Sequence, residues 1–542
     1  MAHQISELPS QILETKQSHN AGPLAAASSG PLSSKQRRPL FIIVSVFAVT
    51  VAIAVRWYGL AEHSLWIDEG YSVWLSRFSP RGIWRLVQAD TSPPVYYWFL
   101  HFWTRLFGTS EVSLRGMSAF FATLSIPLFM LVAKRVLQDK ALLLVLWLYA
   151  FCVFQVHYAK DARFYSLLSF CSIASLYFLI VFLDRRSFLS FAGLVVALVA
   201  GLYIHNMMFF YLPGLALAWL LYPSTLSLGR RVRDGLLCGA LVLLIYLPWL
   251  PVLAMQTKAV ASSFWVPKPT LWRLVETLCS LSGLDFSYFY RMLSLPARDR
   301  WVFMLALVLP LVFCVVAAFW KVTAVGRRKA AALLCYALCP VLLAFFYSLL
   351  GSTSVFLERT FIASSAALLL LLACSVTHQT GVRKRLSGAL AIMVLLGSAI
   401  SLIGFFKYYQ TEDWRGMTEY LIGLPQQKRL IVSATMVGQV LFDYYSARDR
   451  KMHPPESSSA KFGLEEPMVS RPKSYSDQAV LASLQQAVES GNFEEIDVIP
   501  SHAPPQLGLL LQKYLMENCG SLTERTFNDV TAVRCISPRG SF

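Results

Sequence analysis

The sequence predicts a mostly α protein: a bundle of transmembrane helices followed by a small α/β domain at the C-terminal end. Of the 542 residues, 56% are hydrophobic and only 15% are charged, whereas soluble domains carry about 25% charged residues. Apolar runs of roughly 17–22 residues, long enough to cross a hydrocarbon core, recur along the chain. Basic clusters separate these runs, as in the cytoplasmic loops of membrane proteins.

The expected elements follow from these runs. Residues 1–38 are rich in Ser, Ala, Gln and Pro without a periodic apolar face, which predicts a disordered cytoplasmic tail. The transmembrane domain follows at residues 39–406. Its spans are expected near residues 39–56, 115–133, 141–157, 164–183, 188–204, 207–222, 235–251, 301–320, 331–350, 361–377 and 387–406. If every basic cluster lies on the cytoplasmic side of the membrane, the chain has roughly these eleven spans and a cytoplasmic N-terminus.

The net charge of +17 does not indicate nucleic-acid binding, because the basic residues lie in short clusters between apolar runs. Two segments outside the spans, residues 95–107 and 264–275, are apolar, aromatic and too short to cross. We expect both to lie along the membrane interface.

Residues 407–542 have a different composition, and an odd number of spans places them outside the cytoplasm. Leu430–Ser433 and Glu494–Ile499 have the composition of buried strands, and residues 438–446 that of a helix. Strands that alternate with helices predict an extracytoplasmic α/β domain. Residues 451–475 are expected to form a flexible insertion.

The cysteines do not indicate a zinc site, because no CxxC pair or Cys/His spacing is present. Eight of the ten lie in or beside apolar segments, where a cysteine behaves as a small core residue. Cys519 and Cys535 instead share the polar C-terminal region. A disulfide between them is plausible outside the cytoplasm.

The first outer loop contains an adjacent pair of acids, Asp68 and Glu69, and a third acid, Asp90. Sugar transfer needs a carboxylate to take or orient the acceptor proton, and partial desolvation at a membrane boundary raises a carboxyl pKa. Asp68 and Glu69 are therefore candidate catalytic residues, and Asp90 is a candidate for substrate binding. The alternative is that Asp68 caps an interfacial helix that begins near Tyr71.

Several basic residues lie on the outer side, where the positive-inside bias should deplete them. They are Arg115, Lys160, Arg163 and Arg359. A bound lipid phosphate would explain them, because Arg forks and Lys charges bind phosphate well. The alternative is interfacial snorkelling, or pairing with Asp161 and Glu358.

Asp161 and His205 are further candidates for the same substrate cavity. A histidine at a helix end is more often only a hydrogen-bonded interface residue. No metal-ligand spacing stands out, although Asp68 and Asp161 could share a divalent ion if their loops meet. No cofactor is therefore assigned, and a divalent metal stays open.

An ordered set of short motifs covers most of residues 40–420. They are Trp66–Glu69, Ser92–Trp98, Phe107–Glu111 with Arg115, Tyr158–Tyr165, His205, Pro248–Trp249, Glu358–Arg359 and Asp413–Arg415. Each motif alone is weak, but the ordered set is fairly specific. It resembles the protein O-mannosyltransferase and aminoarabinose transferase superfamily, the GT-C glycosyltransferases of family 39 and their relatives.

This resemblance implies a polyprenyl-phosphate-linked monosaccharide as donor and an inverting transfer on the extracytoplasmic side. It implies that Asp68 and Glu69 hold the acceptor or act as base, and that Lys160 and Arg163 bind the lipid phosphate. The chain departs from the eukaryotic protein mannosyltransferases in ending with an α/β domain and lacking their large lumenal β-trefoil insertion. The acceptor therefore stays open between a glycan, a lipid and a protein.

Two other functions are compatible with a bundle of this kind. A sugar transporter or lipid flippase would place polar residues near the bilayer midplane, but the ionisable residues here gather at one face, which favours an enzyme. A non-catalytic scaffold would leave the outward-facing arginines and aspartates unexplained.

Overall fold

A computed structural model describes residues 34–262, 265–320, 322–377, 381–424, 429–448, 481–482, 484–485 and 494–538. The chain divides into two units, Met1–Val44 and Ser45–Phe542. Apart from the beginning of the first helix, the fold and the site lie in the second unit. Of the tail expected at residues 1–38, residues 1–33 lie outside the described residues, and residues 34–38 are the beginning of a helix. The insertion expected at residues 451–475 also lies outside the described residues.

The predicted membrane bundle is confirmed. Within the described ranges, eight helical stretches are long and apolar enough to cross a membrane. They are α1 (Ser34–Trp57), α5 (Glu111–Val136), α8 (Tyr165–Arg185), α11 (Leu228–Tyr246) continued by α12 (Leu250–Ser262), α15 (Arg300–Ala317), α16 (Ala324–Leu350), α17 (Ile362–Thr377) and α18 (Gly381–Tyr408). The bent pair α6 (Asp139–Phe151) and α7 (Val153–Ala159) makes a ninth if it is one span, and α9 (Phe188–Ile204) and α10 (Met208–Leu221) are shorter apolar helices. Each expected span thus coincides with a helix or with the bent pair, while the number of spans stays approximate.

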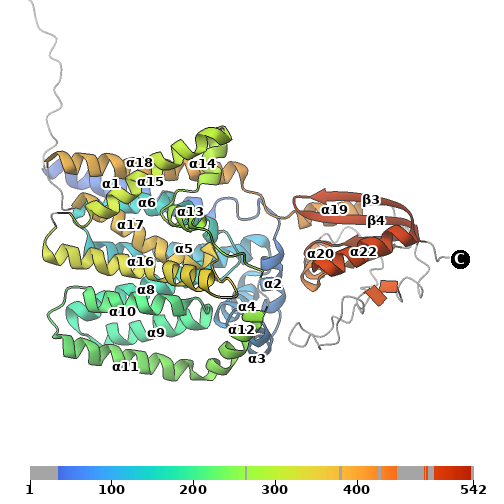
Figure 1. Cartoon of the computed structure of the whole chain (residues 1–542), viewed down its shortest axis with the longest axis horizontal. Coiled ribbons are helices and arrows are strands. Elements are labelled where there is room, and N and C mark those ends of the chain that lie inside the picture. Colours follow the sequence, from blue (N-terminus) through green and yellow to red (C-terminus); the bar gives the residue numbers. More distant parts are fainter. Residues whose placement is uncertain are drawn as a thin grey trace, which may run out of the picture. The chain divides into compact units, whose positions relative to one another are not determined.

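Helix α17 is the centre of the bundle. Its side chains are buried along almost the whole helix, and it packs against α6, α8, α15 and α16. The small residues from Ala363 to Ala367 let neighbouring helices approach closely, which is how helices associate where lipid removes the hydrophobic driving force. Helix α16 lies between α17 and α10 (Figure 1).

The bend between α6 and α7 shapes the site. The two helices meet at 51°, and Cys152 at the break has an extended backbone conformation. Gly283 approaches this point so closely that a Cβ there would lie 3.3 Å from the Cα atom of Cys152. Because α7 turns away from α6, it ends in the short loop that contains Lys160, Asp161 and Arg163.

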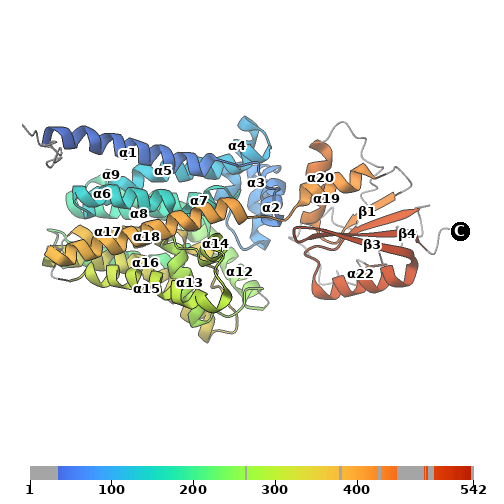
Figure 2. The ribbon, with the colours of Figure 1, turned by 90° about the horizontal axis from the view of Figure 1, so that it is seen from above.

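Short helices gather at one end of the long ones. These are α2 (Ile67–Ser76), α3 (Pro80–Leu86), α4 (Val95–Phe107) and α12, and both views place them together (Figures 1 and 2). Helix α4 has 13 residues, so it is too short to span the bilayer, as the sequence predicts. In α3, Ser79 caps the helix by accepting a hydrogen bond from the Gly82 amide.

The C-terminal region contains a four-stranded sheet in the order β1-β2-β4-β3. Strand β1 (Arg429–Ser433) is parallel to β2 (Glu495–Ile499), and β4 (Val530–Pro538) is antiparallel to both β2 and β3 (Cys519–Phe527). Helices α19 (Trp414–Gly423), α20 (Met436–Arg448) and α22 (Pro505–Asn518) accompany it. The two predicted strands and the predicted helix near 438–446 are present, whereas α19, α22 and the β3–β4 hairpin were not predicted.

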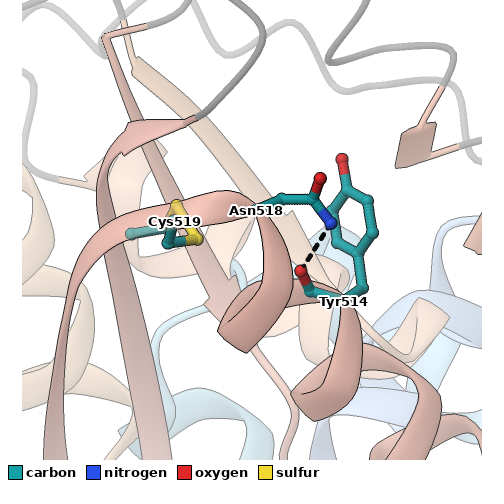
Figure 3. Close-up of a disulfide and its surroundings, with 4 residues drawn as sticks. Tyr514, Asn518 and Cys519 are labelled. Carbon is teal, nitrogen blue, oxygen red and sulfur yellow. Dashed lines mark hydrogen bonds between the residues drawn. A yellow bond between two sulfur atoms is a disulfide. The ribbon is translucent and has the colours of Figure 1, made fainter.

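The β3–β4 hairpin turns at Asn528 and Asp529, both with positive φ, as a tight two-residue turn requires. The expected disulfide joins Cys519 at the start of β3 to Cys535 in β4, with Cα atoms 5.5 Å apart. Beside it, the Asn518 side chain donates a hydrogen bond to the Tyr514 carbonyl at the end of α22 (Figure 3).

Helix α20 packs against α2, the helix that carries the acidic pair. Gly70 of α2 is required by this contact, because a Cβ there would lie 2.6 Å from the Leu441 side chain of α20. The Tyr445 hydroxyl accepts a hydrogen bond from the Leu65 amide and donates one to Glu111, each at 2.7 Å. The sheet region therefore helps to fix the position of α2.

The disulfide gives the first testable prediction. Replacing both Cys519 and Cys535 with serine should lower the free energy of unfolding by about 3 kcal/mol, because the bond closes a loop of 16 residues. In the unreduced protein these two cysteines should resist alkylation, which peptide mapping measures. Alkylation of both before any reduction would contradict the pairing.

Candidate active site

Glu69, predicted as a catalytic residue, is a buried acid held in an ion pair. Its carboxylate forms a two-pronged ion pair with Arg115, with Nε–Oε1 at 2.8 Å and Nη2–Oε2 at 2.6 Å. It also accepts hydrogen bonds from the Ala162 amide at 2.8 Å and the Trp66 amide at 3.3 Å. The pair thus joins the N-terminus of α2 to α5 and to the loop after α7.

The N–H donors of Arg115 are all used in hydrogen bonds. Its remaining N–H groups donate to the carbonyl oxygens of Leu60, His63 and Ser64 at 2.7–2.9 Å. Together with the two bonds to Glu69, these contacts use all five guanidinium donors. The predicted substrate-binding residue Arg115 therefore has no donor left for a ligand in this arrangement.

Asp68 lies in a different environment, because successive helical side chains point about 100° apart. Its side chain is 30% exposed, and its Oδ2 lies 3.2 Å from Nη2 of Arg359. Its main-chain carbonyl accepts a hydrogen bond from Nη1 of Arg163 at 3.1 Å. Of the adjacent acids, one is sealed in the protein and the other is accessible.

Arg163 and Arg359 both retain unused donors. Arg163 is buried, and its Nη1 also lies 3.4 Å from the hydroxyls of Ser72 and Tyr97. Arg359 lies against the rings of Trp66 and Tyr165, 5.4 and 5.8 Å from their centres. Within the described residues, the Nε–H of each arginine is buried without a hydrogen-bond partner. A buried guanidinium group, Arg163, and a half-buried one, Arg359, both with spare donors beside one carboxylate, form a site suited to an anion.

Asp90 and His205 border the same site. Burial raises the pKa of Asp90, with the charge of Asp68 adding to the effect and that of Arg163 opposing it. The His205 ring lies 4.3 Å from the Phe164 ring and accepts a hydrogen bond from the Met207 amide. Burial, followed by the charges of Arg163 and Arg359, lowers the pKa of His205 to about 3, so this ring is neutral.

Asp161 and Lys160 lie instead on the side of Glu69 and Arg115, where these four residues help to line one small cavity. Asp161 accepts a hydrogen bond from the Trp66 indole at 3.1 Å. Burial, and then the charge of Glu69, raises the pKa of Asp161. Lys160 lies over the Phe406 ring at 4.5 Å, and burial lowers its pKa to about 8.

The predicted residues therefore form two groups. The open group contains Asp68, Asp90, Arg163, His205 and Arg359, and the closed group contains Glu69, Arg115, Lys160 and Asp161. A divalent metal shared by Asp68 and Asp161 would have to join the two groups, because Asp68 belongs to the open group and Asp161 to the closed one. The Asp68 carboxylate is paired with Arg359, and the Asp161 carboxylate accepts a hydrogen bond from Trp66. In the part of the chain that the structure describes, no cluster of three His, Cys, Asp or Glu residues could hold a metal ion.

The sequence reasoning missed two residues at the N-terminus of α2. Glu412 accepts hydrogen bonds from the Ile67 amide at 3.0 Å and the Trp414 indole at 2.7 Å. His502, from the loop between β2 and α22, lies 2.8 Å from Glu412. Glu412 directly precedes the Asp413–Arg415 motif, which could have pointed to it, but no sequence signal singles out His502.

Comparison with known proteins adds independent findings. Residues 91–251 match the protein family described as dolichyl-phosphate-mannose-protein mannosyltransferase. This range includes the motifs at Ser92–Trp98, Tyr158–Tyr165, His205 and Pro248–Trp249. None of the curated proteins matches the sequence significantly.

Solved structures share the fold over nearly the whole chain. ArnT from Cupriavidus metallidurans in the apo state has a TM-score of 0.56 at 14% identity, covering 92% of this chain and 98% of that one. The same protein bound to undecaprenyl phosphate gives a TM-score of 0.51 at 15% identity, with the same coverage. The apo oligosaccharyltransferase from Archaeoglobus fulgidus gives 0.50 at 11% identity, covering 90% of this chain and 74% of that one.

At such low identities the likeness shows the fold alone, and it does so across both the helical bundle and the sheet region. Together with the match over residues 91–251, it confirms the resemblance predicted from the motifs. The chain is an integral membrane protein with the fold of the GT-C glycosyltransferases.

Proposed function

We infer that the protein is a glycosyltransferase that moves a monosaccharide from a polyprenyl-phosphate carrier to an acceptor on the extracytoplasmic face, with inversion. The observation that carries this function is the pairing of accessible Asp68 with two arginines that keep spare buried donors. The family described for residues 91–251 and the undecaprenyl phosphate bound to ArnT support a lipid-phosphate donor.

The two arginines would bind the donor phosphate. A guanidinium fork offers paired N–H donors to phosphate oxygens, and such charge-assisted bonds are about twice as strong as neutral ones. The rings of Trp66 and Tyr165 keep the Arg359 guanidinium in place. Fixed cations at the leaving oxygen stabilise the charge that develops there as the bond to the sugar breaks.

Phosphate binding would also activate Asp68. In the unliganded arrangement its carboxylate is held by Arg359 at 3.2 Å, so this oxygen is not free to take the proton of the acceptor. A bound phosphate competes for the same guanidinium, so it frees Asp68 to accept the acceptor proton. The acceptor oxygen then bonds to the anomeric carbon while the carbon–phosphate oxygen bond breaks on the opposite face.

Glu69 and Arg115 would position this machinery rather than take part in the reaction. Their paired atoms are fully engaged with each other and with five main-chain groups, the amides of Trp66 and Ala162 and the carbonyls of Leu60, His63 and Ser64. By fixing the first turn of α2 they determine where Asp68 points. The disulfide between Cys519 and Cys535 supports the extracytoplasmic placement, because such bonds persist in oxidising compartments.

The function is tested by replacing Asp68 with asparagine, which keeps the shape but removes the base. Transfer from a radiolabelled polyprenyl-phosphate sugar should fall by roughly 10²–10⁴-fold, while binding of polyprenyl phosphate persists. Asp184→Asn is the matched control, because Asp184 also pairs with an arginine, Arg135, at similar exposure. Full activity of Asp68→Asn would remove Asp68 from the mechanism.

The substitutions Arg163→Lys and Arg359→Lys keep the positive charge but remove the paired N–H donors of the guanidinium group. Losing charge-assisted hydrogen bonds worth about 1.5–3 kcal/mol should raise the KM for the lipid donor about 10- to 100-fold. Exposed Arg298 gives the matched control, Arg298→Lys. An unchanged KM in both site variants would show that the donor phosphate binds elsewhere.

Glu69→Gln should act on folding rather than on chemistry. It leaves the buried charge of Arg115 without its counter-ion, which costs about 3–5 kcal/mol. The thermal midpoint of the purified protein should therefore drop clearly, whereas that of Asp68→Asn should stay near the wild-type value. A Glu69→Gln protein with unchanged stability and lost activity would instead make Glu69 a catalytic residue.

A further inference from the structure

Two side-chain carboxamides, those of Asn206 and Gln256, form a hydrogen-bonded pair at the end of the bundle where the short helices gather. Asn206 is in the turn between α9 and α10, and Gln256 belongs to α12. Nδ2 of Asn206 donates to Oε1 of Gln256 at 2.8 Å and to the Thr91 carbonyl at 2.9 Å. Nε2 of Gln256 donates to the Val87 carbonyl at 3.0 Å. The pair therefore joins the α9–α10 turn to α12 and to the segment that follows α3.

These contacts fix which atom each carboxamide presents. The carbonyls of Thr91 and Val87 are main-chain acceptors, so each must face a side-chain NH₂ group and not a side-chain oxygen. Oδ1 of Asn206 is then left over: it is buried and, among the described residues, has no hydrogen-bond partner. Gln256 itself is only 4% exposed. A buried acceptor without a donor costs free energy, so an unpaired one calls for an explanation.

The unpaired atom can recognise only a hydrogen-bond donor. Oδ1 of Asn206 is an acceptor, and the carbonyls of Thr91 and Val87 beside the pair are acceptors as well. Asp90, which directly precedes Thr91, adds a carboxylate. A phosphate or carboxylate ligand has no proton to offer such a group, whereas a hydroxyl group donates one readily. A ligand that carries several hydroxyl groups, such as a sugar ring, fits this chemistry.

Aromatic rings border the same region. The rings of Trp84 and Trp98 are stacked with their centres 5.9 Å apart. Trp84 also lies 4.8 Å from the buried Trp249 ring and 6.4 Å from Tyr203, which is in the last turn of α9, three residues before Asn206. Trp84 and Trp98 are half-buried and keep part of their surface exposed. Sites for small ligands combine aromatic walls with a few placed polar groups in this way.

The Phe164 ring connects the carboxamide pair to the arginines. The His205 ring lies 4.3 Å from the Phe164 ring, and Cζ of Arg163 lies 5.1 Å from the centre of that same ring. Asn206 directly follows His205. In a lipid-phosphate sugar the sugar ring is bonded to the phosphate itself. A donor whose phosphate is held by Arg163 therefore has its sugar in the space next to Arg163, and Asn206 borders that region.

We propose that Asn206 and Gln256 form the subsite that recognises the donor sugar. Oδ1 of Asn206 accepts a hydrogen bond from one hydroxyl group of the ring, and Gln256 holds the Asn206 carboxamide in orientation. The proposal rests on the proposed function and extends it from the phosphate to the sugar. Asn206 determines specificity, because a site that hydrogen-bonds a substrate hydroxyl group rejects an analogue that lacks it. Gln256 is a positioning residue.

The alternative is that the pair only ties the α9–α10 turn to α12. A tie of this kind uses the NH₂ groups of Asn206 and Gln256 and has no use for Oδ1 of Asn206. Loss of a tie would weaken the binding of every donor equally. Loss of recognition would affect only sugars that carry the recognised hydroxyl group, so the two roles differ in a measurable way.

The test measures binding of lipid-phosphate sugars to the full-length protein in detergent by isothermal titration calorimetry, which needs no acceptor. The probes are undecaprenyl phosphate, its mannose, glucose, galactose and arabinose conjugates, and the monodeoxy analogues of the sugar that binds most tightly. In the wild-type protein, removal of one particular hydroxyl group should weaken binding about 10-fold. In Asn206→Ala the parent sugar should bind about 10-fold more weakly, and removal of that hydroxyl group should have no further effect.

Two further variants complete the test. Gln256→Leu frees the Asn206 carboxamide, so the preference for the hydroxyl group should shrink; this variant also serves if Asn206→Ala does not fold. Asn518→Ala is the matched control, because the Asn518 carboxamide also donates to a main-chain carbonyl but lies in the sheet region. It should keep the full preference. Thermal midpoints show that each variant is folded.

Three outcomes would overturn the subsite. If Asn206→Ala weakens every lipid equally and keeps the wild-type preference, the pair is only a structural tie. The subsite is also excluded if no sugar conjugate binds more tightly than undecaprenyl phosphate, or if no monodeoxy analogue binds more weakly than its parent. Failure of the proposed function gives a different result, because the wild-type protein would then neither bind undecaprenyl phosphate nor release radiolabel from any of the sugar conjugates.

Discussion

The buried ion pair between Glu69 and Arg115 is the interaction on which the rest of the site depends. An unpaired charge in this interior would cost several kcal/mol, so each partner requires the other. Between them they bind α2, α5, the loop before α2 and the loop after α7. The region around the start of α2, the start of α5 and the loop after α7 are far apart in sequence, and the pair brings them to one point. Asp68 and Arg163 owe their positions to this arrangement.

The site shows how two adjacent acids acquire different properties. Glu69 points inward and accepts four hydrogen bonds, and Asp68 points toward Arg359 and solvent. Separation of this kind lets one carboxylate stabilise the fold while the other stays available for chemistry. The arginines follow the same division, because Arg115 has every donor occupied while Arg163 and Arg359 keep spare ones.

Much of the fold was predictable from sequence because membrane helices have a strong local signal. Runs of apolar residues between basic clusters located each span, and β-branched runs located β1 and β2. The β3–β4 hairpin was missed because β3 has mostly exposed side chains and no apolar alternation. The site residues were identified as a set, but their division was not predictable. Arg115 and Lys160 lie on the side of Glu69 and not on that of Asp68. This placement depends on the bend at Cys152 and on contacts between distant loops.

The central claim is that Arg163 and Arg359 receive a lipid phosphate and thereby release Asp68. A structure of the protein with bound polyprenyl phosphate tests this most directly. The account predicts phosphate oxygens within hydrogen-bond distance of both guanidinium groups, with Asp68 no longer paired to Arg359. A phosphate bound on the Lys160 side, with the Asp68–Arg359 pair intact, would contradict it.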